Sequence, residues 1–182
     1  MKDFFTPDYM FASFSEVTPA FLQSIGVRAL LIDIDNTLAP YEQADPDERI
    51  MTWFAELEKN GIQAALVSNN HAPRVERFGK PLFERFGIFA YPNSCKPFGG
   101  TLECAMEAMK VTPTETAMLG DQILTDCFAG KHIGLRAIIV PPIKDKTGLF
   151  FRFKRLLERP AIRKYAKQNG YQPWMAFWKI EK

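Results

Sequence analysis

The stretch LLIDIDNTLAP, residues 30–40, decides the fold, because it sets two aspartates at the end of an otherwise apolar run. Side chains alternate along a strand, so Asp33 and Asp35 are expected to point the same way, about 7 Å apart. Two carboxylates in a poorly solvated cleft repel each other unless they share a proton or face a cation. A turn or helix cap, the ordinary use of an aspartate at a strand end, does not need two acids on one side. The pair therefore indicates a functional site.

Outward from this stretch, short apolar runs alternate with helical patterns. Strands that are apolar throughout and joined by helices belong to a sheet covered on both faces. We predict a three-layer α/β core with a parallel sheet of five strands. These strands are residues 28–34, 63–67, 88–90, 116–119 and 136–140.

Capping residues mark the helices between the predicted strands. Residues 45–48, with Asp45 as the cap and a proline at the first helical position, start the first helix, and residues 60–61 end it. The region after residue 70 is helical up to Gly87, with a break expected at residues 79–81 because a proline removes a helical hydrogen bond. Further helices are predicted at residues 98–110 and 122–133.

Composition excludes several classes of protein. At 182 residues and 47% hydrophobic, the chain suits one compact domain. Its apolar stretches fall far short of the roughly 20 residues of a membrane-spanning helix, and residues 1–11 do not resemble a secretory signal, so a cytoplasmic location is expected. Three cysteines without a CxxC pair indicate neither a disulfide framework nor a zinc site, and mostly buried thiols are expected. They are Cys95, Cys104 and Cys127.

Polar residues follow other predicted strands as well, including Ser68 and Asp121. In open α/β sheets the working residues collect at the carboxyl ends of the strands. Clustered carboxylates select a hard cation, and Mg²⁺ fits best because it also accepts phosphate oxygens and water. An aspartate can attack phosphorus to give an aspartyl-phosphate, which divides hydrolysis into two easier steps. Taken alone, Asp121 could equally cap the helix that follows it.

Four short elements resemble, in order, the four signatures of the haloacid dehalogenase (HAD) phosphohydrolase superfamily. They are DIDNT at 33–37, VSNN at 67–70, SCKP at 94–97 and GDQILTD at 120–126. The resemblance covers residues 28–140 and implies a Rossmann-like core. Their ordered occurrence favours a catalytic site over a helix cap at Asp121 and a solvated lysine at Lys96.

The resemblance implies a role for each matching acid. Asp33 would be the nucleophile, and Asp35 would be the general acid and then the general base. Mg²⁺ would be held by Asp33, by Asp35 through its backbone carbonyl, and by Asp121. Asp126 would accept hydrogen bonds from a lysine or from metal-bound water, as a supporting residue.

The same resemblance implies donors for the phosphate. Ser68 and the backbone amides of Asn36 and Asn69 would donate hydrogen bonds to the phosphoryl oxygens, and Lys96 would supply positive charge where negative charge accumulates. Thr37 would support the site. Residues 36–67 and 69–95 are each filled by one helix–strand unit, which leaves no room for a cap domain. An open site suits a phosphate carried by something large or anchored, because the substrate must then exclude water.

The chain divides by charge into a core, residues 1–143, and an appendage, residues 144–182. The appendage holds 11 Lys and Arg against 3 acids, a net +8, and the core holds 12 against 18, a net −6. A basic amphipathic helix is predicted near its start, with an apolar stripe made of Leu149, Phe150, Phe153, Leu156 and Leu157. Such a helix can lie on an anionic membrane, or it can pack on the sheet with its charges solvated, and both alternatives stay open. Nucleic acid is a weaker alternative, because the core is acidic and no nucleic-acid motif occurs.

The segment FSEVTPAFLQSIGVRALLIDIDNTLAP, residues 14–40, together with GDQILTD and the missing cap, resembles the YqeG family of HAD subfamily IIIA. This resemblance implies dephosphorylation of phosphatidylglycerophosphate, an anionic phospholipid, at the inner membrane surface. A phosphatase of a soluble sugar, nucleotide or protein phosphate is the alternative within the class. A non-catalytic adaptor for protein or RNA is the alternative outside it, and the presence of all four signatures argues against it.

Overall fold

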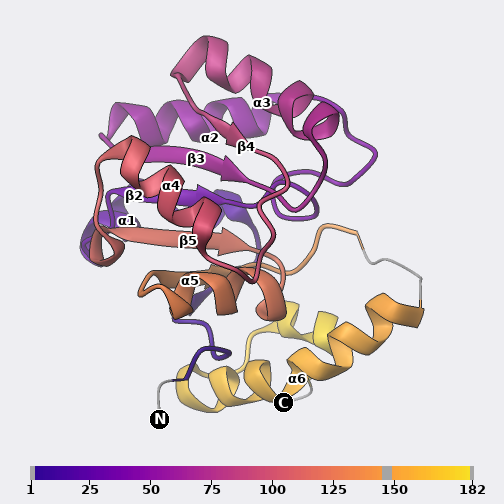
Figure 1. Cartoon of the computed structure of the whole chain (residues 1–182). Helices are drawn as coiled ribbons and strands as arrows, with labels where there is room; N and C mark the ends of the chain where they lie inside the picture. The colour runs from indigo at the N-terminus through magenta and orange to yellow at the C-terminus, as the bar shows by residue number, and fades with distance from the viewer. Residues whose placement is uncertain (1–2, 145–148, 181–182) are drawn as a thin grey trace.

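The computed structural model describes residues 3–144 and 149–180, and it shows a parallel sheet with helices on both faces (Figure 1). The six strands lie in the order β1-β6-β5-β2-β3-β4. Their bounds are β1 Tyr9–Met10, β2 Ala29–Ile32, β3 Gln63–Val67, β4 Ala90–Tyr91, β5 Thr116–Gly120 and β6 Arg136–Ile139. The α-helices are α1 Pro19–Ser24, α2 Glu48–Lys59, α3 Ala72–Phe86, α4 Gly100–Met109, α5 Phe128–His132 and α6 Leu149–Asn169. Short helical turns are η1 Phe14–Glu16, η2 Pro113–Glu115, η3 Ile123–Cys127, which is a π-helix, and η4 Pro173–Trp178.

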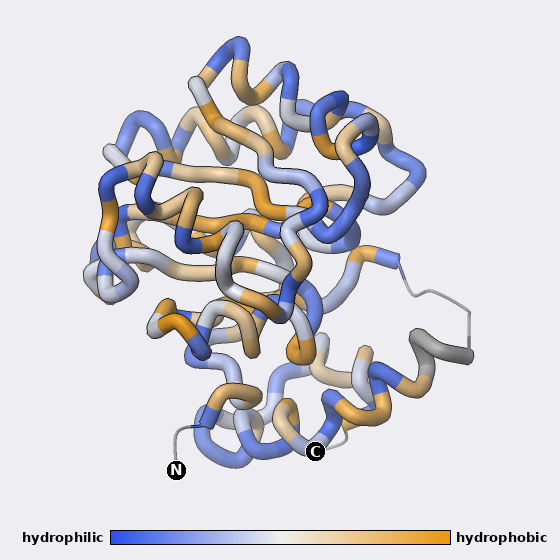
Figure 2. The backbone as a smooth tube through the Cα atoms, viewed as in Figure 1, coloured by the Kyte–Doolittle hydropathy of each residue, from blue (hydrophilic) through white to orange (hydrophobic). Residues whose placement is uncertain are grey.

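Alternate residues of each central strand enter opposite sides of the core. In β2, Leu30 and Ile32 pack with α1, α2 and α3, whereas Leu31 packs with α4 and α5. Strands β2 and β5 are buried on both faces, as the centre of a parallel sheet with two helical layers requires. Figure 2 shows the apolar strands at the centre of the molecule and hydrophilic segments on the outer helices.

The prediction of five strands is wrong by one, because β1 forms a sixth at the edge of the sheet. Tyr9 and Met10 pair in parallel with Ile138 and Ile139 of β6. A strand of two residues is too short to show an alternating pattern, so sequence periodicity gives no signal for it. The other five strands match their predicted positions within a few residues.

Two helices differ in detail from the prediction. The cap of α2 is Asp47 rather than Asp45, since the Asp47 carboxylate accepts a hydrogen bond from the amide of Ile50 at 2.9 Å. Helix α3 continues through Pro81 without the expected break and ends at Gly87, which adopts φ +69°. The buried side chains on both sides of the proline, such as Phe78 and Leu82, keep one helical face against the sheet and offset the lost hydrogen bond.

The appendage packs against the edge of the sheet formed by β1 and β6. Ile162 and Tyr165 of α6 and Trp178 of η4 are buried there with Met10 and Ile139. The tyrosine hydroxyl also accepts a hydrogen bond from the amide of Met10, at 3.1 Å. In Figure 1, α6 lies below the sheet, next to the N-terminal segment.

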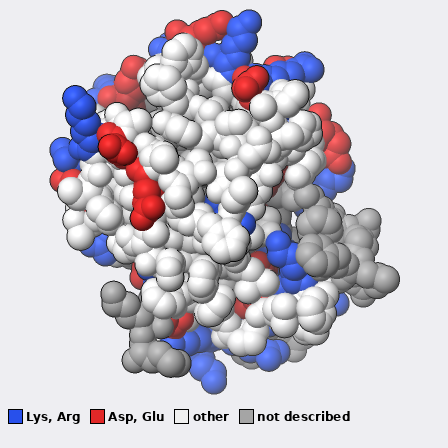
Figure 3. Space-filling view, in the orientation of Figure 1, with Lys and Arg blue, Asp and Glu red and all other residues white. Residues whose placement is uncertain are grey.

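The predicted apolar stripe does not face this core. Phe153, Leu156 and Leu157 are each about half exposed, at 56%, 51% and 49%. The side chains of Leu149 and Phe150 lie outside the described residues. The alternative in which this stripe packs on the sheet is therefore wrong for its described members, because other residues of α6 supply the contact. Basic side chains are visible on the lower surface in Figure 3.

Two further expectations concern thiols and membrane spans. Cys95 and Cys104 are exposed rather than buried, and only Cys127 of the three lies in the core. Among the helices in the described ranges, none is long and apolar enough to cross a bilayer.

The order of the strands fixes where a site can form. From β2 the chain moves outward through β3 and β4, and it then returns to β5 on the other side of β2. Ligands of such sheets bind at the carboxyl ends of the strands where the direction reverses. In this molecule that point lies between β2 and β5.

Candidate active site

Asp33 follows β2 directly and lies at this reversal point, with 6% of its surface exposed. Its Oδ1 accepts a hydrogen bond from Lys96 Nζ at 2.7 Å, and its Oδ2 accepts one from the Thr37 hydroxyl at 3.2 Å. The amide of Asp33 donates to the carbonyl of Leu119 on β5, so the backbone at this point is fixed by the sheet. Both carboxylate oxygens are thus oriented by buried partners.

Lys96 reaches this carboxylate from the loop after β4. Its ammonium group lies 2.8 Å from Asp126 Oδ1 and donates to the carbonyl of Val67 at 2.8 Å. The pKa of Lys96 is raised, because the attraction of Asp126 and Asp33 outweighs burial, which opposes the charge. Lys96 is therefore a fixed, buried positive charge.

Asn69 holds the loop that presents this lysine. Its side-chain Oδ1 accepts hydrogen bonds from the Lys96 amide at 2.7 Å and from Ser94 Oγ at 3.0 Å. Its Nδ2 donates to the Lys96 carbonyl at 2.8 Å. The side chain of Asn69 thus acts on the position of Lys96, a role that the sequence did not suggest.

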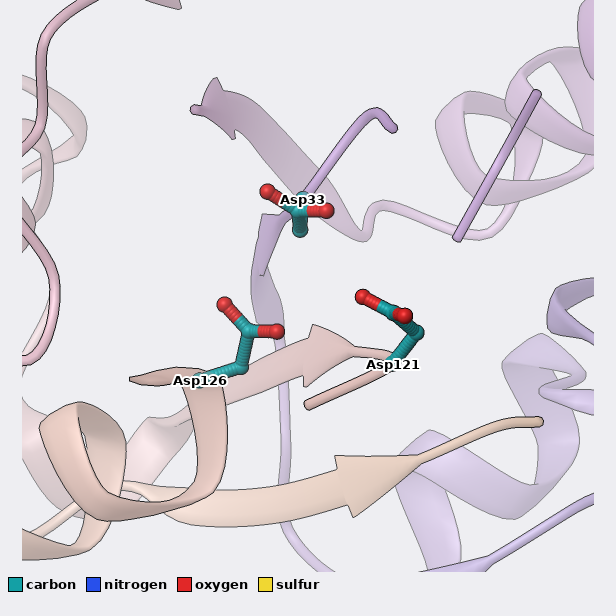
Figure 4. Close-up of side chains that lie close together, drawn as sticks. All are labelled: Asp33, Asp121 and Asp126. Carbon is teal, nitrogen blue, oxygen red and sulfur yellow. The ribbon is translucent and has the colours of Figure 1, made fainter. Parts of the chain in front are cut away.

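Three carboxylates converge at this end of the sheet. Asp33, Asp121 and Asp126 each offer an oxygen atom, and these atoms lie within 4.8 Å of one another (Figure 4). Asp121 follows β5, and Asp126 comes from the π-helix η3. A Cβ atom on Gly120 would collide with the Asp126 carboxylate, so the absence of a side chain there allows this approach.

Asp35 is placed apart from the three converging acids. Its Oδ1 is 3.1 Å from Arg74 Nη2, and its Oδ2 accepts a hydrogen bond from Asn70 Nδ2 at 3.0 Å. Sequence reasoning identified neither partner. Asp35 is 8% exposed, and its carboxylate is oriented by Arg74 on α3 and by Asn70, just before that helix.

The expected phosphate donors differ in whether they already donate a hydrogen bond within the protein. Ser68 is buried, and its Oγ accepts a hydrogen bond from the Asn70 amide at 3.1 Å, which leaves the hydroxyl proton available to donate. The amide of Asn36, in contrast, donates to the carbonyl of Ala39 at 2.7 Å. Asn36 adopts φ +68° in this tight turn, so its backbone serves the turn rather than an incoming phosphate.

The charges of the site favour a divalent cation. Two cations, Lys96 and the Arg155 guanidinium, face four buried carboxylates, which are Asp33, Asp121, Asp126 and Glu158. Burial raises the pKa of Asp33 to about 8 and that of Asp121 to about 6, against an ordinary value of 3.8. A divalent cation between the carboxylates would favour their ionised forms, and oxygen donors are those that Mg²⁺ prefers. The donor set present therefore fits a hard divalent ion.

Arg155 of α6 contacts this site directly, which the sequence did not predict. Its Nη2 lies 2.8 Å from Asp121 Oδ2, and its Nη1 lies 2.7 Å from Glu158 Oε2. Sequence analysis assigned no role in the site to any basic residue of this helix. One signal was present, because Glu158 is an isolated acid in a strongly basic segment, and an isolated acid of this kind can mark a buried partner.

Tyr41 borders the site on the loop after β2. It is 45% exposed, and burial together with the carboxylates of Asp35 and Asp33 raises the pKa of its hydroxyl. The side chain therefore lies within electrostatic reach of the acids while still facing solvent.

The arrangement defines an α/β protein with buried acids and one lysine at the reversal point of a parallel sheet. Comparison with known proteins gives the family. Residues 10–134 match the haloacid dehalogenase-like hydrolase family, and the chain belongs to it. A relative from Bacillus subtilis (strain 168), described as probable phosphatase YqeG, is 33% identical over 174 residues, which are 96% of this chain and 98% of the relative.

Solved structures agree with the fold. CbbY from Rhodobacter sphaeroides, in complex with phosphate, superposes with a TM-score of 0.53 at 19% identity, covering 68% of this chain and 90% of that one. An uncharacterised protein from Listeria monocytogenes serotype 4b gives a TM-score of 0.50 at 17% identity, covering 67% and 85%. The family match and the relative together support phosphatase function of the HAD type.

Proposed function

We propose that the protein hydrolyses phosphate monoesters, with Asp33 as the nucleophile. The observation that carries this proposal is the buried Asp33 carboxylate, held by Lys96 and Thr37 at the meeting point of three acids. Asp33 attacks phosphorus, the ester oxygen leaves, and water then releases phosphate from the aspartyl-phosphate. Lys96 and Ser68 donate to the phosphoryl oxygens as negative charge builds on them.

Asp35 protonates the leaving oxygen in the first step and accepts a proton from the attacking water in the second. Asn70 and Arg74 orient its carboxylate for both steps. Asp33 and Asp121 are the proposed carboxylate ligands of Mg²⁺, joined by the backbone carbonyl of Asp35. Asp126 is close enough to serve as a further ligand or to hold metal-bound water. When bound, the ion neutralises the carboxylates and the charge on the phosphoryl group.

Replacement of Asp33 tests the proposal. Asp33→Asn is expected to abolish phosphate release in the presence of Mg²⁺, because an amide oxygen is a poor nucleophile. Asp45→Asn is the matched control, since Asp45 pairs with Arg77 on the surface and should leave the rate unchanged. Release by the Asp33 variant at the rate of the unmodified protein would refute the proposed role, and unchanged cellular function of that variant would favour an adaptor.

For the substrate we propose phosphatidylglycerophosphate, presented at the inner face of a membrane. The connection from β2 to β3 holds α2, and the one from β3 to β4 holds α3, which supports a site without a cap domain. The exposed Phe153, Leu156 and Leu157 lie on the same helix as Arg155, beside the site. Apolar side chains among basic ones suit the surface of an anionic membrane.

Parallel rate measurements distinguish this substrate from soluble ones. Phosphate release is measured from vesicles that contain phosphatidylglycerophosphate and from soluble sugar, nucleotide and protein phosphates. A higher kcat/KM on vesicles supports phosphatidylglycerophosphate as the substrate. A clear preference for a soluble ester refutes that substrate but leaves the proposed hydrolytic chemistry in place.

A further inference from the structure

Arg155 contacts both the side chain and the backbone of Asp121. Its Nη2 pairs with Asp121 Oδ2 at 2.8 Å, and its Nη1 donates to the backbone carbonyl of Asp121 at 3.1 Å. Asp121 itself is fully buried. A planar guanidinium that binds both the side chain and the main chain of one residue fixes the rotation of its carboxylate.

Glu158 in turn holds the Arg155 guanidinium. Glu158 Oε2 accepts from Arg155 Nη1 at 2.7 Å and from Trp178 Nε1 at 3.3 Å, while Glu158 Oε1 accepts from the amide of Ile123 at 3.0 Å. Glu158 and Trp178 are both fully buried. The connected groups therefore run from the C-terminal turn η4 through α6 to the site.

The charge of Glu158 decides what Arg155 does to Asp121. An arginine alone would neutralise Asp121 and compete with a cation for it. Because Glu158 balances the guanidinium, the pair adds no net charge, and Asp121 keeps its negative charge for the site. The guanidinium occupies Oδ2, whereas Oδ1 receives a longer contact of 3.4 Å from Gln122. Figure 4 shows the Asp121 carboxylate facing the space that it shares with Asp33 and Asp126.

We propose that Arg155 is a positioning residue of the active site, which turns one oxygen of Asp121 toward a bound divalent cation. This inference rests on the proposed function, since it concerns the same metal site. Helix α6 then contributes to metal binding, although it lies outside the four sequence signatures. A residue that orients a metal ligand typically changes metal affinity by about 10–100-fold when it is replaced.

The test uses the full-length protein with Arg155→Gln and Arg155→Lys. The matched control is Arg163→Gln, an exposed arginine of the same helix. Mn²⁺ binding is measured by electron paramagnetic resonance, which needs no turnover, and the Mg²⁺ concentration for half-maximal rate is measured separately. Circular dichroism in the absence of metal reports whether each variant is folded.

We expect both Arg155 variants to bind Mn²⁺ at least about 10-fold more weakly, because neither has the planar guanidinium that contacts Asp121 at two atoms. The lysine variant should be less affected, since it keeps the positive charge. The control should bind as the unmodified protein does. Unchanged Mn²⁺ affinity in a folded Arg155 variant would overturn the inference, and tighter binding would overturn it by showing that Arg155 competes with the metal. If the glutamine variant does not fold, the lysine variant decides the question by the same criterion.

The two proposals fail in different ways. Absence of phosphate release by the unmodified protein refutes the proposed function. Phosphate release together with unchanged metal affinity in the variants refutes the role of Arg155 alone.

Discussion

Asp126 can approach Lys96 only because Gly120, at the end of β5, has no side chain. A methyl group at that position would overlap the Asp126 carboxylate and push it away from the lysine. Lys96 would then lose one of its two anionic partners, and the geometry around Asp33 would change with it.

Gly120→Ala should therefore lower the rate of phosphate release at least about 10-fold and destabilise the fold by about 1–3 kcal/mol, the usual result of overpacking. Gly100→Ala is the matched control, because a Cβ there meets nothing within 4 Å. Steady-state rates and urea unfolding measure the two effects. Equal behaviour of the two alanine variants would show that Asp126 can move without consequence.

The leaving group tests the role of Asp35. Asp35→Asn should slow the hydrolysis of an alkyl phosphate by about 10²–10⁴-fold, because the departing alkoxide needs a proton. p-Nitrophenyl phosphate, whose leaving group departs as a stable anion, should be affected much less. The ratio of the two rates is the measurement, and a variant that slows both esters equally would assign Asp35 to binding or structure instead.

At the scale of elements, α6 meets the core with a different face from the one that its apolar residues suggest. Ile162 is fully buried, whereas Leu156 is 51% exposed. Ile162→Ala should cost about 2–5 kcal/mol of unfolding free energy, and Leu156→Ala should change it by less than about 0.5 kcal/mol. Chemical denaturation of the two variants gives both values. A larger cost at Leu156 would mean that the apolar stripe is the packed face.

The sequence predicted the central elements well for a physical reason. Strands β2 and β5 are buried throughout and β3 is buried over its last three residues, so all three show up as largely apolar runs. The acids that follow β2 and β5 stand out against that background. The orienting partners were not predicted, because Arg74 and Arg155 resemble solvated arginines until the fold brings them to Asp35 and Asp121. For Arg155 the only signal was the isolated acid Glu158. Edge strand β1 gave no pattern at two residues.

At the scale of the whole molecule, the appendage packs directly on the core. Its buried residues cover the edge of the sheet at β1 and β6, and its Arg155 reaches the site. The division of the chain at residue 143 stays a prediction. The packing of the appendage leads us to expect that residues 1–143 do not fold on their own.

Truncation after residue 143 should therefore expose the β1–β6 edge and give a protein that binds a hydrophobic dye and lacks a cooperative unfolding transition. Loss of Trp178 and Ile162 from the core removes several kcal/mol, which is a large share of the stability of a typical domain. Scanning calorimetry of the truncated and full-length chains makes the comparison. A truncated chain with a sharp transition and full activity on soluble esters would show that the appendage is a separate unit.

The link from Trp178 through Glu158 and Arg155 to Asp121 also has a consequence for biosynthesis. A growing chain emerges from the ribosome with its N-terminus first, so all four signatures appear before the residues that orient Asp121. Residues 1–143 are therefore synthesised before the residues that cover the β1–β6 edge and contact Asp121.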